Sequence, residues 1–361
     1  MEMKTFKIGG IHPADNKFSA NVAIETLRQL PSRVVIPLSQ HIGAPATPIV
    51  GKGDKVKVGT LIAKSSGFVS ANIHSSVSGT VVKIDNFEDA FGVRKPAIEI
   101  EVEGDEWEES IDRSDKVVKE INFTSEEIVK KIREAGIVGM GGAGYPTPIK
   151  TSLPEGKKAD ILIVNGIECE PFLTADDRLM IERAEQIIIG ARIINKALGI
   201  QNAIIAIDEN KPKAIATLTA LCKLYIGVNV RVCKTKYPQG GEKQLIKAIT
   251  GKELPSGKLP FDVGCVVQNV GTVHAVYEAV MKNKPLFERI ITVSGDGIEY
   301  PSNYRVRVGT PISYLIDRAG GMNENVSKII LGGPMMGNAI VNHSAPATKL
   351  TSGGLLFKEN N

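Results

Sequence analysis

A glycine-rich stretch at residues 136–150, GIVGMGGAGYPTPIK, is the segment of this sequence best suited to chemistry. Gly139, Gly141 and Gly144 have the spacing of a dinucleotide-binding fingerprint, and Gly142 lies between them. Glycine lets a backbone approach a phosphate closely and turn its N–H groups toward it. A standard fingerprint follows a strand, whereas this stretch follows a helix signal that begins with the capping box at 124–127. We therefore predict no standard Rossmann turn, and the glycines need another explanation.

Polar residues follow three predicted strands, at the point where each strand ends. A buried strand at 160–165 leads into a turn with one amide and two carboxylates. A strand at 229–233 leads to two glycines that open a helix at 242–250. A third strand, at 263–267, leads to a polar helix start. Parallel α/β sheets bind ligands at the carboxyl ends of their strands. We expect one crevice there, with these members: Asn165, Glu168, Glu170, Gly240, Glu242, Asn269 and Thr272.

Each of these residues has a structural alternative, because Asn and Thr cap helices and Glu is common in solvated loops. Their convergence with the glycine loop favours a flavin mononucleotide (FMN) site over a hydrolytic one. Loop N–H groups, Lys150, Asn269 and Thr272 would hold the phosphate and ribityl chain, while Asn165 and Glu168 face the ring. The nicotinamide candidates are Tyr145 and Glu170, although a packed loop aromatic explains Tyr145 equally well. No catalytic residue is assigned, and Cys169 has no activating neighbour in sequence.

Composition excludes several classes of protein. The 361 residues carry a net charge of +4 that is spread along the chain, which argues against a nucleic-acid partner. The four cysteines show neither zinc-site spacing nor a disulfide pattern and suit a reducing cytoplasm. We expect no signal peptide, no transmembrane segment and no metal site. His12, His41 and His74 are interpreted as surface or turn residues.

The elements that must position the site fall into an α/β chain of three modules. Residues 1–110 predict a β module of short strands resembling a biotinyl/lipoyl-type barrel sandwich, but the segment FVSANIH at 68–74 lacks the carrier lysine, which favours a scaffold or docking role. An acidic, solvated linker at 103–109 follows. Residues 115–283 alternate strands and helices and predict a Rossmann-like parallel α/β flavin domain. Residues 285–340 predict a ββαβ, β-grasp domain, and 341–361 a polar tail without periodicity.

The motifs together resemble the C subunit of the Rnf electron-transport complex, and more distantly the flavin site of the 51-kDa NADH-binding subunit of complex I. The resemblance rests on GMGGAGYPT with Lys150, the phrase NGIECEPFLTADDRLM at 165–180, GGE at 240–242, NVGT at 269–272 and GGIHP at 9–13. It implies FMN as cofactor and NAD(H) as substrate. It also implies a cytoplasmic subunit, held on the inner face of the membrane by partner subunits of an ion-translocating ferredoxin:NAD oxidoreductase.

The sequence departs from that family in one respect, which limits the cofactors to be expected. Its members continue into a ferredoxin-like domain whose cysteine runs hold [4Fe–4S] clusters, but this sequence reaches Asn361 before any such run. We therefore expect no iron–sulfur cluster on these residues, whether the chain is a truncation or a short form. A second interpretation stays open: a non-catalytic docking or quinone-site subunit resembling the A subunit of the sodium-pumping NADH:quinone reductase. The intact glycine loop with Glu168 and Glu170 speaks against it.

Overall fold

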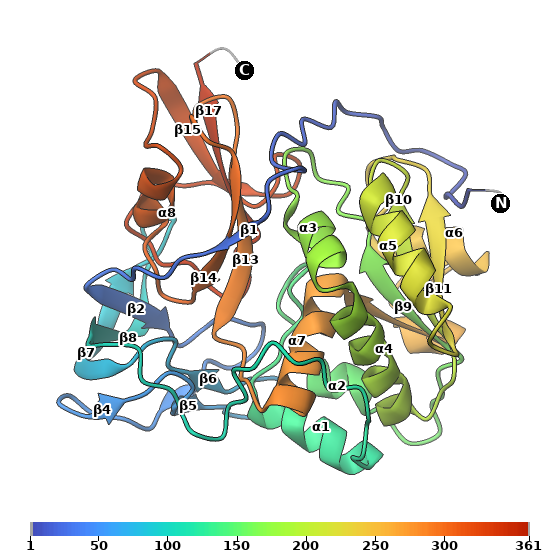
Figure 1. Ribbon diagram of the computed structural model, residues 1–361, viewed down its shortest axis with the longest axis horizontal. Helices are drawn as coiled ribbons and strands as arrows, with labels where there is room; N and C mark the ends of the chain where they lie inside the picture. The colour runs from blue at the N-terminus through green and yellow to red at the C-terminus, as the bar shows by residue number, and fades with distance from the viewer. Residues whose placement is uncertain (1–2, 360–361) are drawn as a thin grey trace.

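A computed structural model describes residues 3–359 and shows three bodies in contact (Figure 1). The first is a barrel of two small sheets. Their strand orders are β2 (Arg33–Pro37), β8 (Arg94–Val102), β7 (Gly79–Glu88), β4 (Lys55–Val56) and β3 (Thr47–Pro48), β5 (Leu61–Lys64), β6 (Ile73–His74). Alternate residues such as Val34 and Ile36 on β2 point inward and are fully buried, as a half-exposed strand requires.

The second body is a four-stranded, wholly parallel sheet between helices. Its order is β11 (Val228–Cys233), β10 (Ala203–Asp208), β9 (Ile161–Gly166) and β12 (Cys265–Asn269). The sheet is buried on both faces. Leu162 and Val164 of β9 belong to one hydrophobic cluster, while Ile163 between them belongs to the cluster on the opposite face.

The helices of this body include the predicted ones, and α2 and α3 are additional. They are α1 (Ser125–Glu134), α2 (Thr147–Thr151), α3 (Ala175–Glu182), α4 (Ala184–Leu198), α5 (Pro212–Cys222), α6 (Glu242–Thr250) and α7 (Val270–Lys282). The Thr124 hydroxyl accepts the Glu127 N–H, so α1 begins at the predicted capping box. One strand boundary was wrong: β12 begins two residues later than predicted, because Pro260–Val263 forms a 3₁₀ turn (η1) that Gly264 closes at φ 78°.

The third body is a six-stranded mixed sheet with α8 (Ile312–Arg318) against it. Its order is β1 (Ile24–Thr26), β14 (Ser302–Arg307), β13 (Glu288–Ser294), β17 (Gly353–Lys358), β15 (Val326–Leu331) and β16 (Asn338–Ala339). The ββαβ order of β13, β14, α8 and β15 is as predicted. The expectation of an aperiodic tail was wrong, since β17 lies between β13 and β15 and buries Leu355 and Leu356 completely.

One segment that the sequence placed with the barrel lies elsewhere, and a second has a partner beyond the barrel. The N-terminal arm bridges to the parallel sheet through Lys4 and Cys233 and then supplies β1, which pairs in parallel with β14 (Figure 1). The acidic linker is not simply solvated, because Trp107 packs edge-on against Phe287 with ring centroids 5.5 Å apart. Long-range pairing of this kind leaves no periodic signal in the sequence.

Candidate functional site

The predicted strand ends do meet at the carboxyl edge of the parallel sheet. Asn269 of β12 lies directly opposite Asn165 of β9 in the strand register. The Asn165 amide donates to the Gly240 carbonyl at 2.9 Å, which ties the start of α6 to this edge. The Asn269 oxygen accepts the N–H groups of Gly271 and Thr272 at 2.9 and 3.3 Å and so caps α7.

The glycine loop follows α1, as predicted, and lies across the start of α7. Thr272 is fully buried, and its hydroxyl accepts the Met140 N–H at 2.9 Å. Gly141 is so close to Asn269 that a Cβ at 141 would lie 2.9 Å from the Asn269 Cβ. Gly139 closes the loop by donating to the Tyr145 carbonyl at 2.9 Å. The loop is therefore held from below by two residues of the α7 N-terminus.

The side of the loop that faces away from α7 is open. Gly141 and Gly142 are exposed, and a Cβ at Gly142 would have no heavy atom within 4 Å. Within residues 3–359, the backbone N–H groups of Gly141, Gly142 and Gly144 donate to no protein acceptor. Gly144 has a φ of +72° and packs against His41 and Leu350, so the neighbouring bodies help fix the loop. Successive free N–H groups on a turn form an anion cradle.

Lys150 and Glu242 form the wall next to the loop. The Lys150 ammonium lies 3.0 Å from the Glu242 carboxylate and 3.3 Å from the Val267 carbonyl. Glu242 is the first residue of α6, whose N-terminus after Gly241 has no side-chain cap. The uncapped N–H groups and the nearby ammonium both favour negative charge at this end of the crevice.

The two glutamates of the 165–170 turn have different surroundings. Glu168 has a left-handed φ of 46°, and its carboxylate accepts the N–H groups of Asp176 and Asp177 at 2.8 and 3.1 Å, so it caps α3. Glu170 instead accepts the Met335 N–H at 2.9 Å from the loop between β15 and β16. Burial raises the pKa of Glu170 above its usual value.

Buried charges lie beside these strand ends, and the sequence reasoning gave them no role. Asp176 accepts the Asn269 amide at 2.7 Å, and burial together with the charge of Glu168 raises the pKa of Asp176 to about 6. Arg289 is buried beside the loop and donates to the Thr351 carbonyl at 3.2 Å. Asp176 stood within the phrase that carried the family resemblance, but no pattern distinguishes Arg289 from an ordinary strand residue.

Lys17, on the N-terminal arm, is a third residue that sequence reasoning missed. Its ammonium donates to three carbonyl oxygens of one loop, those of Glu168, Glu170 and Leu173, at 2.9, 2.8 and 2.6 Å. Burial lowers the pKa of Lys17 to about 8. A segment far away in sequence therefore fixes the backbone that carries both glutamates.

The remaining candidate residues have fewer interactions with the site. The Tyr145 side chain is half-buried, and within the described chain it forms no hydrogen bond, ring pair or cation–π contact with the other candidates. Burial raises the pKa of the Cys169 thiol, which keeps it protonated at neutral pH. His12 is exposed and His41 lies in a bend, as expected, but His41 and His74 are buried in the barrel, so a surface placement was wrong for both. Across residues 3–359, no group of three or more His, Cys, Asp or Glu side chains is arranged to hold a metal ion.

Taken together, the crevice offers amide donors for an anion, a lysine and fixed side-chain amides. Activated thiol or imidazole groups are not among these donors. Such a set fits a phosphate-bearing cofactor that brings its own reactivity, and FMN has that chemistry.

Comparison with known proteins defines the class. Three family models match in chain order: the RnfC barrel sandwich hybrid domain over residues 4–105, the Nuo51 FMN-binding domain over 132–278 and the SLBB domain over 290–339. The chain is therefore a barrel sandwich, an FMN-binding α/β domain of the Nuo51 type and an SLBB domain. The glycine loop and every other predicted site residue lie within the FMN-binding match.

Relatives then give the family. The C subunit of the proton-translocating ferredoxin:NAD(+) oxidoreductase complex of Clostridium ljungdahlii is 49% identical, over 99% of this chain and 78% of its own. The C subunit of the Na(+)-translocating complex of Acetobacterium woodii is 42% identical, over 99% and 80%, and that of the ion-translocating oxidoreductase complex of Rhodobacter capsulatus is 44% identical, over 97% and 68%. The chain belongs to the RnfC family, the C subunits of Rnf-type ion-translocating oxidoreductase complexes.

A solved structure supports the fold. A chain of the NAD+-reducing [NiFe]-hydrogenase in the H2-reduced state matches with a TM-score of 0.55 and 21% identity, over 65% of this chain and 47% of that one. At this identity the likeness speaks for the fold alone. None of the helices in residues 3–359 is long and apolar enough to cross a bilayer.

Proposed function

We propose that this chain exchanges electrons between NAD(H) and a bound FMN as the peripheral subunit of an ion-translocating ferredoxin:NAD oxidoreductase complex. The observation that carries the proposal is the open glycine loop. Its free N–H groups at Gly141, Gly142 and Gly144 lie in the FMN-binding match, beside the uncapped start of α6. The names of the relatives supply NAD, ferredoxin and the complex. Partner subunits would hold the chain at the cytoplasmic face of the membrane.

Each candidate residue would have a separate role in holding FMN. The loop N–H groups would bind the phosphate of FMN, and Lys150 would add positive charge at the same end. Asn269 and Thr272 would hold the loop and α7 in place, because both are already engaged with these elements. Asn165 and Gly240 would form the opposite wall, and Glu168 would fix the turn that faces the ring. FMN, when bound, supplies the step between two-electron and one-electron transfer.

The nicotinamide nucleotide would enter beside the same turn. Glu170 is the candidate for its ribose, because this half-buried carboxylate has one oxygen without a hydrogen-bond partner in the described residues. Tyr145 would offer a ring face to the nicotinamide. An iron–sulfur cluster would have to come from elsewhere, as we assign no cluster ligands in this sequence.

Titration of the purified chain with FMN tests the proposal. We expect saturable quenching of flavin fluorescence at a one-to-one ratio, followed by anaerobic bleaching of the bound flavin by NADH. A parallel calorimetric titration with a soluble quinone analogue should show no comparable binding. Failure of the flavin to bind, or tight binding of the quinone analogue alone, would overturn the assignment in favour of a docking or quinone-site subunit.

A further inference from the structure

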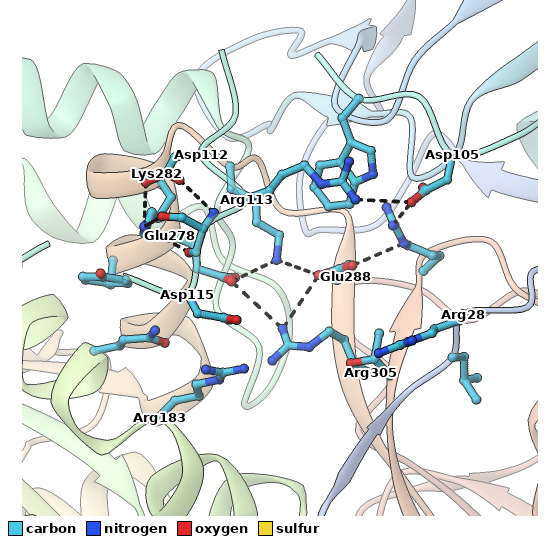
Figure 2. A pocket seen from close by; sticks show the side chains of 18 of the residues that line it. Arg28, Asp105, Asp112, Arg113, Asp115, Arg183, Glu278, Lys282, Glu288 and Arg305 are labelled. Atoms are coloured by element: carbon cyan, nitrogen blue, oxygen red, sulfur yellow. Dashed lines mark hydrogen bonds and ion pairs between the residues drawn. The ribbon is translucent and has the colours of Figure 1, made fainter. Parts of the chain in front are cut away.

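A cleft of about 450 Å³ lies where the three bodies of the chain meet, away from the flavin crevice (Figure 2). The linker after β8, the C-terminal part of α7 and the strands β13 and β14 all contribute side chains, as does the chain after β1. None of the residues assigned to FMN or NAD(H) lines it. Its volume lies within the range of small-molecule sites, which is roughly 300–1,000 Å³.

Charged side chains dominate the cleft. Seven basic and five acidic residues line it, so the basic residues exceed the acidic ones by two. Two of the acidic residues, Glu288 and Glu278, already form ion pairs with basic residues of the protein. Glu288 lies 2.6 Å from Lys284 and 3.2 Å from Arg307, and Glu278 lies 2.9 Å from Lys284.

Cations surround the buried carboxylates of the cleft. Burial by itself would raise the pKa of Glu288, yet the charges of Lys284, Arg307 and Arg305 outweigh burial and hold that pKa below its usual value. Burial would likewise raise the pKa of Glu278, but Lys284, His274 and Arg305 outweigh it and lower that pKa. A carboxylate that stays ionised when removed from water reports a surrounding excess of cations.

Two of the arginines have no acidic partner. Within the described chain, the side chains of Arg183 and Arg28 form no hydrogen bond and no ion pair, although both line the cleft. Asp115 also lines it without an ion pair and, like Arg28, is exposed; it is already included in the charge balance. Arg183 is half-buried at the junction of α3 and α4, where its backbone N–H donates to the Leu179 carbonyl at 2.8 Å. Its position is therefore set by the fold.

Figure 2 shows Arg183, Arg28 and Arg305 around the same opening, coming from three different elements. Arg305 is the inner member, at 3.7 Å from Glu288 and 4.0 Å from Glu278. Guanidinium groups match phosphate oxygens in pairs and are less strongly hydrated than ammonium groups. A phosphate ester carries about −1.5 to −2 charge at neutral pH, which is close to the excess of basic residues.

We propose that this cleft binds a small soluble phosphate-bearing anion, with Arg183, Arg28 and Arg305 as its ligands. Because the three arginines lie at the start of α4, in the segment after β1 and on β14, the bound anion connects the parallel α/β body to the SLBB body. Occupancy then stabilises the relative placement of the flavin domain and its neighbour.

Calorimetric titration of FMN-saturated chain with inorganic pyrophosphate, at constant ionic strength, tests the proposal. Saturation with FMN blocks the flavin phosphate site. We expect one site per chain, at least tenfold weaker binding in Arg183→Gln and in Arg28→Gln, and unchanged FMN affinity in both variants. Arg94→Gln is the matched control, because Arg94 is exposed on the β7–β8 hairpin and donates to the Asn86 carbonyl at 2.9 Å.

Three outcomes would overturn the proposal. Absence of measurable binding at millimolar pyrophosphate would make the cleft a purely structural charge network. Equal binding by wild type and both cleft variants would place the anion elsewhere. Equal loss in Arg94→Gln would show that net charge, and not the cleft, governs the binding.

Discussion

Asn165 and Asn269 stand opposite each other in register at the carboxyl ends of β9 and β12. Their side chains nevertheless reach different partners, since Asn165 donates to the Gly240 carbonyl and Asn269 donates to Asp176. Asn165 therefore ties the segment before α6, and Asn269 the first turn of α3, to one rigid pair of strands. Loops that are positioned by strand ends can hold a ligand accurately, although their own backbone lies outside the sheet.

Gly142→Val should abolish FMN binding without unfolding the protein. A Cβ at this position meets no protein atom within 4 Å, so the side chain occupies the space above the loop. We expect at least hundredfold weaker FMN binding by fluorescence titration and a change in unfolding free energy within about 0.5 kcal/mol. Gly51→Val is the control, because a Cβ there has its nearest neighbour at 3.9 Å and lies in the barrel. Wild-type FMN affinity in Gly142→Val would refute the phosphate assignment.

Thr272→Val should weaken the attachment of the glycine loop to α7. The substitution removes the acceptor of the buried Met140 N–H, and an orphaned buried donor costs about 1–3 kcal/mol. We expect a loss of stability of that size in urea unfolding, together with FMN binding more than tenfold weaker. Thr272→Ser keeps the hydroxyl and should retain most of the affinity. If both variants bound FMN equally, the hydrogen bond would have no part in shaping the site.

Glu170→Gln should separate nicotinamide binding from flavin binding. The amide oxygen of Gln can still accept the Met335 N–H, so the contact with the loop between β15 and β16 survives. Loss of the carboxylate should raise the KM for NADH several-fold in an anaerobic NADH:ferricyanide assay, while FMN affinity stays unchanged. A parallel fall in FMN affinity would mean that Glu170 belongs to the flavin wall and not to the nucleotide site.

Asp208 should make the stability of the protein depend on pH. It is fully buried, neither carboxylate oxygen has a hydrogen-bond partner in the described residues, and burial raises its pKa to about 7. The unfolded carboxyl loses its proton near pH 4, so the folded state binds more protons between these values. This residue's contribution to stability therefore falls as pH rises from about 4 to 7.

Asp208→Asn should remove that dependence. We expect the variant to be about 1–4 kcal/mol more stable than wild type at pH 8 and nearly equal to it at pH 4, by urea unfolding. The difference between the two curves isolates Asp208 from the other titrating groups. Parallel curves across this range would show that the carboxyl keeps an ordinary pKa in the folded protein.

Local signals in the sequence predicted the elements that position the site. The capping box at Thr124 starts α1, and the helix predicted at 242–250 is α6 with those same bounds. The apolar run at 160–165 predicted a buried strand, which is β9 to within one residue. These features depend on neighbouring residues, so the chemistry of a short segment is sufficient to specify them.

Longer-range features depended on the tertiary structure. The polar residues around β17 hide a strand pattern in the sequence. The segment is a strand because it pairs with both β13 and β15, which buries Leu355 and Leu356. Lys17 acquires its role only when the N-terminal arm crosses the 168–173 loop. Arg183, Arg28 and Arg305 come together from three elements that are far apart in the sequence.

The sequence by itself determined the family, the order of the modules and the residues gathered at the strand ends. Only the tertiary structure decided how those residues are engaged: Thr272 and Asn269 hold the glycine loop from below, Glu168 caps α3 and Glu170 binds the Met335 N–H. The physical reason is that periodicity and capping act within a few residues. Hydrogen bonds, burial and charge balance depend instead on which distant segments the fold brings into contact.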